Sequence, residues 1–246
     1  MTILQPEYLE VPDNITLGFS TRGGGVSPAP FHSLNMSISR GDSLENVSTN
    51  RSRFLSNWGI KPSQLAQGNQ ISEDGLAVVS SPGVYDACDA LICSTPQIFL
   101  SVLTADCAPI LIWSTERDVV ASVHSGWQGS EMDILGRTID RLVEDFQVPA
   151  ASLCIVIGPG LSQENFEVGP EFSTKFPQDY LQEFGEDRYK FDNNRYLGDK
   201  AIACGVPGSQ IEILNYCTCA DEALFFSHRR DRNTTGRMMS IIGISA

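Results

Sequence analysis

The sequence predicts an α/β protein with a single domain, residues 1–246, in which a mixed β-sheet core is flanked by helices. Apolar segments of strand length mix with helical patterns through the chain, which is typical of this class. No linker, internal repeat or shift in composition marks a boundary between domains. Hydrophobic residues make up 41% of the 246 residues, as in an ordinary globular chain, so wholesale disorder is not expected.

Six short apolar segments predict the strands. Three of them follow one another closely and are rich in aliphatic residues, which favours buried strands. The six segments are 98–103, 110–113, 119–123, 153–157, 211–214 and 238–244. An apolar segment at 15–19 leads into a stretch rich in Gly, Ser and Pro, residues 20–33, which we expect to be an ordered loop.

Two segments predict helices. Over 130–146, apolar residues recur every three or four positions, which places them on one helix face. Ser130 and Asp133 resemble a capping box at its start, and Pro149 lies just beyond its end. A second helix is expected at about 198–204.

Charge and cysteine content exclude several functional classes. A formal net charge of −13 repels nucleic acid and anionic lipid, although a local basic pocket could still bind a small anion. The longest apolar runs are too short to span a bilayer, and the first residues lack the pattern of a secretory signal. Seven cysteines, an odd number, indicate reduced thiols, so we expect a cytoplasmic protein.

Cys107 is the first candidate for chemistry. It ends the segment Thr-Ala-Asp-Cys directly after a predicted buried strand, where a sheet holds reactive groups rigidly. A thiolate at this position could act as a nucleophile or bind a metal. The alternative is a small buried hydrophobic residue, which is the commoner role of a free cysteine.

His124 is the second candidate, because it also follows a predicted strand. It opens the segment His-Ser-Gly-Trp-Gln-Gly and is one of three histidines in the chain. The glycines permit close approach of a ligand to the backbone, and Trp127 offers a flat face for a ring, although core packing is the alternative. A cysteine and a histidine at successive strand ends of one sheet predict a shared site.

Two segments that carry arginine suggest anion binding. Arg22 stands beside three glycines and several hydroxyl residues, a composition that suits phosphate although it matches no known phosphate loop. Arg229, Arg230 and Arg237 lie close together near the end of an acidic chain. We expect Arg22 and at least one of Arg229 and Arg230 to serve the same pocket or its wall. The alternative for the Arg22 segment is a flexible turn. The alternative for the segment with Arg229 and Arg230 is a charged turn exposed to solvent.

Together these segments resemble the laccase-domain family, which was first labelled multicopper polyphenol oxidoreductase and is now described as purine nucleoside phosphorylases. The matches run in family order along almost the whole chain. They are GFSTRGGGVS (18–27), SLNMS (33–37), GDSLENV with NR (41–51), DAL (89–91), TADCAP (104–109), HSGWQG (124–129), IGPGLS with FEVG (157–169), CT (217–218) and FFSHRRD with TGRM (225–238).

The resemblance implies a single α/β domain with a metal, usually zinc, held by two histidines and a cysteine. Cys107 matches the ligand cysteine and His124 one ligand histidine, so both are candidate metal ligands and catalytic residues. The family's activities include phosphorolysis of adenosine, inosine, guanosine and methylthioadenosine, and deamination of adenosine. A purine nucleoside and phosphate are therefore the expected partners, with Arg22, Trp127, Arg229 and Arg230 as our candidates for binding them.

The sequence departs from the family at the second ligand histidine. The family carries it in a Gln-x-His-Gly segment, and the corresponding stretch here is Leu-Ala-Gln-Gly-Asn-Gln. One alignment puts Gln67 at the histidine position and the other puts Asn69 there. An amide oxygen is a poorer zinc ligand than imidazole, so we expect weak zinc binding unless His32 substitutes. The family's HAGWRG has also become HSGWQG, which replaces an arginine with Gln128.

Three functions remain open from the sequence. The first is a metal-assisted purine nucleoside phosphorylase, and the second is a metal-free enzyme with Cys107 as nucleophile and His124 as base. The third is a nucleoside-binding protein with little turnover. A multicopper oxidase is excluded, because a copper cluster needs more imidazoles than three histidines provide, and copper is less favoured than zinc.

Overall fold

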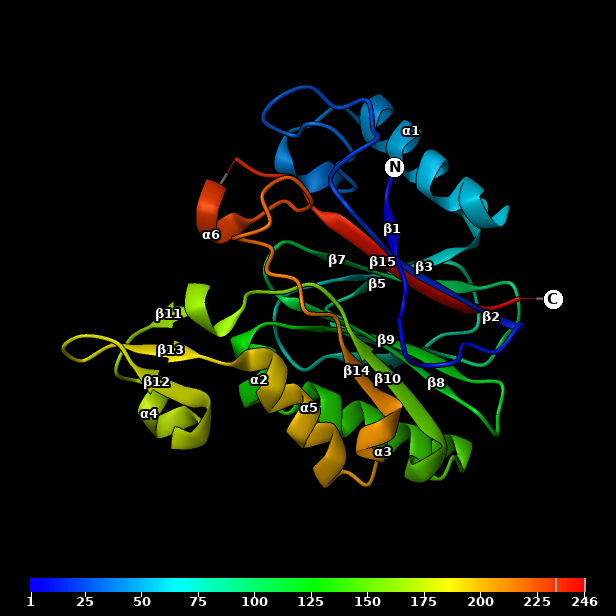
Figure 1. Ribbon diagram of the computed structural model, residues 1–246. Coiled ribbons are helices and arrows are strands. Elements are labelled where there is room, and N and C mark those ends of the chain that lie inside the picture. The colour runs from blue at the N-terminus through cyan, green and yellow to red at the C-terminus, as the bar shows by residue number, and fades with distance from the viewer. Residues whose placement is uncertain (233, 246) are drawn as a thin grey trace.

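The structure is a computed structural model that describes residues 1–232 and 234–245. Two six-stranded sheets form its centre (Figure 1). The first sheet has the order β1 (Ile3–Leu4), β2 (Ile15–Ser20), β15 (Met238–Ile244), β7 (Phe99–Thr104), β3 (Leu65–Asn69) and β5 (Gly83–Asp86). The second has the order β14 (Ile211–Ile213), β10 (Leu153–Ile157), β8 (Ala108–Ser114), β9 (Val120–Ser125), β6 (Ala90–Cys93) and β4 (Leu76–Val78).

Both sheets are mixed, as the sequence predicted. In the first, β7 pairs antiparallel with β15 and parallel with β3. In the second, β10 pairs antiparallel with β8 and parallel with β14. The six predicted strands are present within one or two residues of the expected bounds, and the segment at 15–19 forms β2.

The main core lies between the two sheets. Alternate side chains of each strand face this layer, so aliphatic residues of one sheet pack on those of the other. Leu17, Leu100 and Ile242 from the first sheet join Leu111 and Val156 from the second in one buried cluster. This packing holds the two sheets in a fixed relation and so fixes any site formed where the chain passes between them.

Helices cover the outer faces of both sheets (Figure 1). Helix α1 (Leu44–Leu55) packs on the first sheet through Phe54 and Leu55. Helices α3 (Ile134–Phe146) and α5 (Asn193–Ala203) pack on the second through Ile139, Leu142 and Leu197. No helix in the described part of the chain is long and apolar enough to span a membrane.

A small third sheet lies beside this sandwich. Its order is β11 (Glu167–Val168), β13 (Tyr189–Phe191) and β12 (Leu181–Glu183), and the short helix α4 (Phe172–Lys175) packs on it. The aromatic side chains of Phe172, Phe176 and Phe191 make up its core. The last short helix, α6 (His228–Asp231), precedes β15.

The predicted helix at 130–146 is divided in the structure. Helix α2 (Trp127–Glu131) ends before α3 begins, because Asp133 between them adopts a left-handed conformation with φ of 61°. The expected capping box is wrong: Asp133 makes no capping hydrogen bond, and its carboxylate pairs with Lys200 at 2.7 Å. The Ser130 hydroxyl instead donates to Asn193 Oδ1 at 2.7 Å, which ties α2 to α5.

Candidate functional site

A cavity of about 370 Å³ lies where the chain leaves the first sheet and enters the second. Strand β7 ends at Thr104, residues 105–107 make the crossing, and β8 begins at Ala108. The cavity is lined by Cys107 and His124, by Gln67 and Asn69 from β3, and by Arg40, Arg237 and His228. Among the described residues that line it there is no aspartate or glutamate.

The turn that carries Cys107 is held by polar contacts of the preceding residue. Asp106 has a φ of 93°, which is unfavourable for a residue other than glycine. Its carboxylate accepts hydrogen bonds from the Thr218 hydroxyl at 2.7 Å and from the Arg229 amide at 2.5 Å. Its carbonyl accepts from the amide of Leu161 at 3.0 Å. Three distant segments therefore fix the turn, and with it the position of Cys107.

His124 lies near the end of β9 and is fixed by a buried aspartate. Its Nδ1 is 2.7 Å from Asp89 Oδ1, and both side chains are buried. The Asp89 carboxylate also accepts hydrogen bonds from the amides of Ile71, Ser72 and Glu73. With Nδ1 occupied by Asp89, the Nε2 atom is the ring nitrogen free to face Cys107.

The charges around His124 favour its protonated form. Burial lowers the pKa of His124, but the neighbouring Cys107 and the hydrogen bond with Asp89 outweigh burial and raise it to about 9. Burial raises the pKa of Asp89, but hydrogen bonds from His124 and the Ile71 amide outweigh that effect and lower it. A carboxylate and an imidazole thus form a hydrogen-bonded pair, and the Cys107 thiol lines the same cavity.

Gln67 and Asn69 are on the same face of β3, and both line the cavity. The Gln67 Oε1 atom is buried and has no hydrogen-bond partner in the structure, whereas Asn69 is exposed. An unpartnered buried oxygen is costly, and a bound ligand or ion could satisfy it. Of the two residues that could stand at the missing histidine, Gln67 is the one with a buried, unpartnered oxygen.

The donor set of this cavity is incomplete for tight binding of zinc. Within residues 1–232 and 234–245, no three His, Cys, Asp or Glu side chains converge as metal ligands. Cys107 and His124 could supply two strong donors, and the unpartnered Gln67 oxygen could supply a weak third. Such a set fits a weakly held zinc ion.

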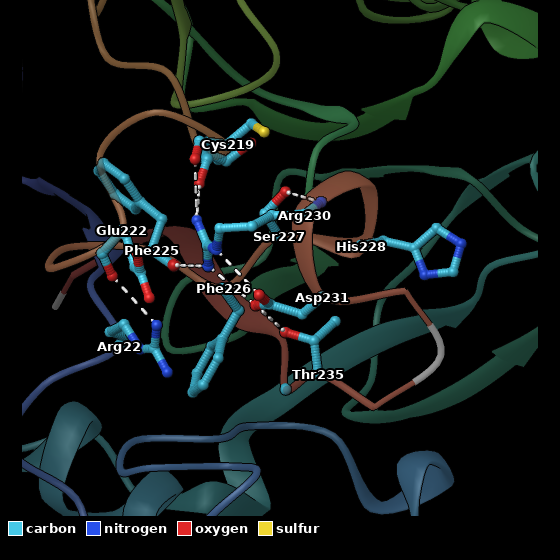
Figure 2. Close-up of polar contacts among 12 residues, drawn as sticks. Arg22, Cys219, Glu222, Phe225, Phe226, Ser227, His228, Arg230, Asp231 and Thr235 are labelled. Atoms are coloured by element: carbon cyan, nitrogen blue, oxygen red, sulfur yellow. Dashed lines mark hydrogen bonds and ion pairs between the residues drawn. The ribbon is translucent and has the colours of Figure 1, made fainter. Parts of the chain in front are cut away.

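Arg22 and Arg230 lie together in another part of the molecule (Figure 2). Arg22 donates to the carbonyls of His32 and Glu222 at 3.1 and 3.0 Å, and its guanidinium lies 4.8 Å from the ring centroid of Phe226. Arg230 donates to the carbonyls of Thr218, Cys219 and Phe225 and pairs with Asp231. These contacts brace the loop that leads to α6. Arg22 and His32 line a separate cavity of about 770 Å³.

Arg229 and Trp127 face the small third sheet. Arg229 donates to the carbonyls of Asn165 and Glu167 at 3.2 and 3.0 Å, and its guanidinium lies 5.5 Å from the Phe166 ring centroid. The Trp127 ring is 5.3 Å from that of Phe172. The structure thus brings Cys107 and His124 together, but it places Arg22, Trp127, Arg229 and Arg230 outside the residues that line their cavity.

Sequence reasoning assigned no role to Asp89 or Arg40 and did not single out Arg237 or His228 from their segment. Asp89 and His124 are 35 positions apart, so no local pattern links them. The one available signal for Arg237 was its place in an arginine-rich segment of an acidic chain. Figure 2 shows His228 pointing away from the hydrogen-bond network around Arg230. His228 lines the cavity of Cys107 and His124, whereas its sequence neighbour Arg230 does not.

Comparison with known proteins agrees with this architecture. Residues 16–245 match the family described as multi-copper polyphenol oxidoreductase laccase. A purine nucleoside phosphorylase of Deinococcus radiodurans is 31% identical over 99% of this chain and 93% of its own length. The purine nucleoside phosphorylase YfiH of Shigella flexneri is 33% identical over 98% of both chains.

Solved structures share the fold. The crystal structure of YlmD from Geobacillus stearothermophilus superimposes with a TM-score of 0.91 at 27% identity, covering 95% of this chain and 93% of that one. The crystal structure of NMB0706 from Neisseria meningitidis gives 0.84 at 29% identity, covering 96% of each chain. The chain therefore belongs to the multi-copper polyphenol oxidoreductase laccase family, and the relatives from Deinococcus radiodurans and Shigella flexneri are named purine nucleoside phosphorylases.

Proposed function

We propose that the protein catalyses phosphorolysis of purine nucleosides in the cavity that contains Cys107 and His124. The observation that carries the proposal is the convergence of Cys107, His124 and the unpartnered Gln67 oxygen in a cavity lined by no described carboxylate. In a chain of net charge −13, such a cavity is the place that an anionic co-substrate can enter. The names of the relatives support the same reaction class.

In this reaction an oxygen of phosphate forms a bond to C1′ of the ribose, and the bond from C1′ to N9 of the purine breaks. The electron pair of the broken bond passes to the purine, which takes up a proton, and ribose 1-phosphate is released. In the cavity without metal, where its pKa is raised to about 9, His124 carries a proton at neutral pH and can deliver it to the departing purine. With zinc on His124, this proton would instead come from water. Asp89 stabilises the protonated ring and fixes its orientation.

Zinc is the proposed metal, held by Cys107 and His124 with Gln67 Oε1 as a weak third ligand. When bound, zinc would supply Lewis acidity that polarises an oxygen of substrate or water. Replacement of imidazole by an amide leads us to propose a low affinity and a reduced rate. The family resemblance also implies deamination of adenosine, which the assay below would report as inosine.

A metal-free Cys–His enzyme is the second candidate function. It is favoured by the presence of Cys107 and His124 in one cavity and by the buried Asp89 that fixes the imidazole. In this version Cys107 acts as nucleophile and His124 as base. Rapid alkylation of Cys107 by iodoacetamide at neutral pH, abolished by His124→Ala, would favour it over the metal-assisted version.

The test is an assay of purified protein of measured zinc content with adenosine and with inosine, each with and without phosphate. We expect free purine and ribose 1-phosphate only when phosphate is present. Cys107→Ala and His124→Ala should each lower the rate about 100-fold or more. Cys204→Ala is the matched control, because this half-buried thiol follows α5 and lies outside the cavity lining.

Two results would contradict phosphorolysis. Equal release of purine with and without phosphate would indicate a hydrolase. A nucleoside that raises the melting temperature without being converted would indicate a binding protein.

A further inference from the structure

We propose that Arg40 and Arg237 form an anion subsite in this cavity and bind a tetrahedral oxyanion of the phosphate class. This inference deepens the proposed function and rests on it, because it names the residues that would hold the phosphate. Both arginines line the same cavity as Cys107 and His124.

Arg237 directly precedes β15 and has guanidinium nitrogens to spare. Its Nη1 donates to the carbonyl of Gly236 at 2.9 Å and more weakly to that of Thr235 at 3.4 Å. Its backbone amide donates to Asn35 Oδ1 at 3.0 Å, which anchors the residue. Its Nε and Nη2 have no acceptor among the described residues, so an anchored and partly buried guanidinium keeps two donors for a ligand.

Arg40, from the N-terminal part of the sequence, supplies a second positive charge to the cavity. It ends the short 3-10 helix Ile38–Arg40 and is exposed. Burial and then the nearby charge of Arg40 lower the pKa of Arg237 to about 10. Two arginines that repel each other within one cavity are stabilised when an anion lies between them.

The aspartates nearest this pair accept hydrogen bonds from other groups. Asp42 accepts hydrogen bonds from the side chains of Ser27, Asn35 and Asn46 and from its neighbour's amide. Asp106 accepts from Thr218 and from the Arg229 amide. In the described part of the chain, neither Arg40 nor Arg237 forms an ion pair within 4.0 Å.

Polar groups near Arg40 suit the remaining oxygens of such an anion. The hydroxyls of Ser37 and Ser39 lie 3.0 Å apart on the same turn, and both residues line the cavity. Guanidinium groups match the oxygens of phosphate in geometry as well as in charge. The ligand could be free inorganic phosphate or the phosphoryl group of a nucleotide, which share this chemistry.

The experiment measures binding by calorimetry to the full chain in a chloride buffer. The ligands are inorganic phosphate, adenosine, and adenosine 5′-monophosphate. The variants are Arg40→Gln, which alters an exposed side chain, and Arg237→Lys, which keeps the charge but loses the planar donors. Arg117→Gln is the matched control, because Arg117 is exposed in the turn between β8 and β9, at the end of these strands opposite Cys107. Melting temperatures verify that each variant is folded.

We expect both variants to weaken phosphate binding about tenfold or more, since each loses a charge-assisted contact, while Arg117→Gln has no effect. Adenosine binding without phosphate should be unchanged in Arg40→Gln. If adenosine 5′-monophosphate binds more tightly than adenosine, and Arg40→Gln removes only that gain, the phosphoryl group of a nucleotide is the source. If inorganic phosphate binds to the wild type and adenosine does not compete with it, the natural ligand of the subsite is free phosphate.

The subsite and the proposed function can fail separately. Phosphate binding that depends on Arg40, in a protein that converts no nucleoside, would keep the subsite and overturn phosphorolysis. Phosphorolysis with the same KM for phosphate in the wild type and in Arg40→Gln would overturn the subsite and keep the function. A folded wild type that binds neither anion would also overturn the subsite.

Discussion

At the scale of single residues, the chemistry of the site depends on the few polar side chains that share the cavity. His124 receives a buried carboxylate on one ring nitrogen and a thiol near the other, and these two neighbours outweigh the cost of burying its charge. Gln67 contributes a buried side-chain oxygen that has no hydrogen-bond partner. His124 is thus paired with Asp89, whereas Gln67 Oε1 has no hydrogen-bond partner. This oxygen marks where a further group would bind.

Gln67→His is expected to raise the zinc content of the purified protein towards one ion per chain. It would complete a set of one thiolate and two imidazoles, which is a usual ligand set for catalytic zinc. Activity should recover less than metal content, because the surrounding contacts that orient a ligand histidine are not built for residue 67. The measurement is zinc per chain by elemental analysis after dialysis.

Asn69→His is the control for this substitution, because Asn69 is on the same strand face but exposed. It should leave zinc content unchanged. If it binds zinc as well as Gln67→His, the assignment of Gln67 to the missing position is wrong. If the unmodified protein already holds one tightly bound zinc, another residue has replaced the lost histidine as ligand.

At the scale of elements, the site is built at the ends of strands and by the turns that leave them. Strand β7 and the turn 105–107 deliver Cys107, β9 delivers His124, and β3 delivers Gln67. Gly126 ends the strand segment of His124 and caps α2, so it lies between the histidine and the helix. A side chain at this position would have its Cβ 2.9 Å from Cys107 Sγ.

Gly126→Ala is therefore expected to displace the thiol and lower phosphorolysis about tenfold or more, since small errors of position cost large factors in rate. Zinc content should fall in parallel. Gly208→Ala is the matched control, because its added Cβ would meet only Ile202 Cδ1 at 3.7 Å, an ordinary contact. Equal activity of the two variants would show that Cys107 does not need its present position.

At the scale of the whole molecule, the packing of one sheet on the other fixes the relative positions of the site residues. Gln67 belongs to the first sheet, His124 to the second, and Cys107 to the crossing between them. Buried residues such as Leu100 and Leu111 fill the layer between the sheets. The stability of this layer and the geometry of the site are therefore linked through the turn at 105–107.

Leu100→Ala is expected to lower the free energy of unfolding by about 2–5 kcal/mol, because it removes buried methyl groups and leaves a cavity between the sheets. Urea denaturation monitored by circular dichroism measures the loss. Val143→Ala on α3 is the control, since Val143 is 37% exposed and should cost much less. Equal losses in the two variants would mean that the layer between the sheets is not the main core.

The sequence by itself determined the fold class, six of the fifteen strands in the described part of the chain, and the placement of Cys107 and His124 at strand ends. Apolar segments of strand length are local signals, and Cys107 and His124 each follow or end one of them. The family motifs added the expectation of zinc and of a missing ligand. The division of the helix at Asp133 was not predicted, because it depends on a left-handed residue and on a pairing with Lys200 from another helix.

The tertiary structure alone decided which polar residues share a cavity. It joined His124 to Asp89 across 35 positions and brought Arg40 and Arg237 together from opposite ends of the chain. It also directed Arg22 and Arg230 to backbone carbonyls, although their sequence surroundings suited an anion. The physical reason is that charge and composition say what a side chain can bind. Only packing decides whether its donors are already used by the protein.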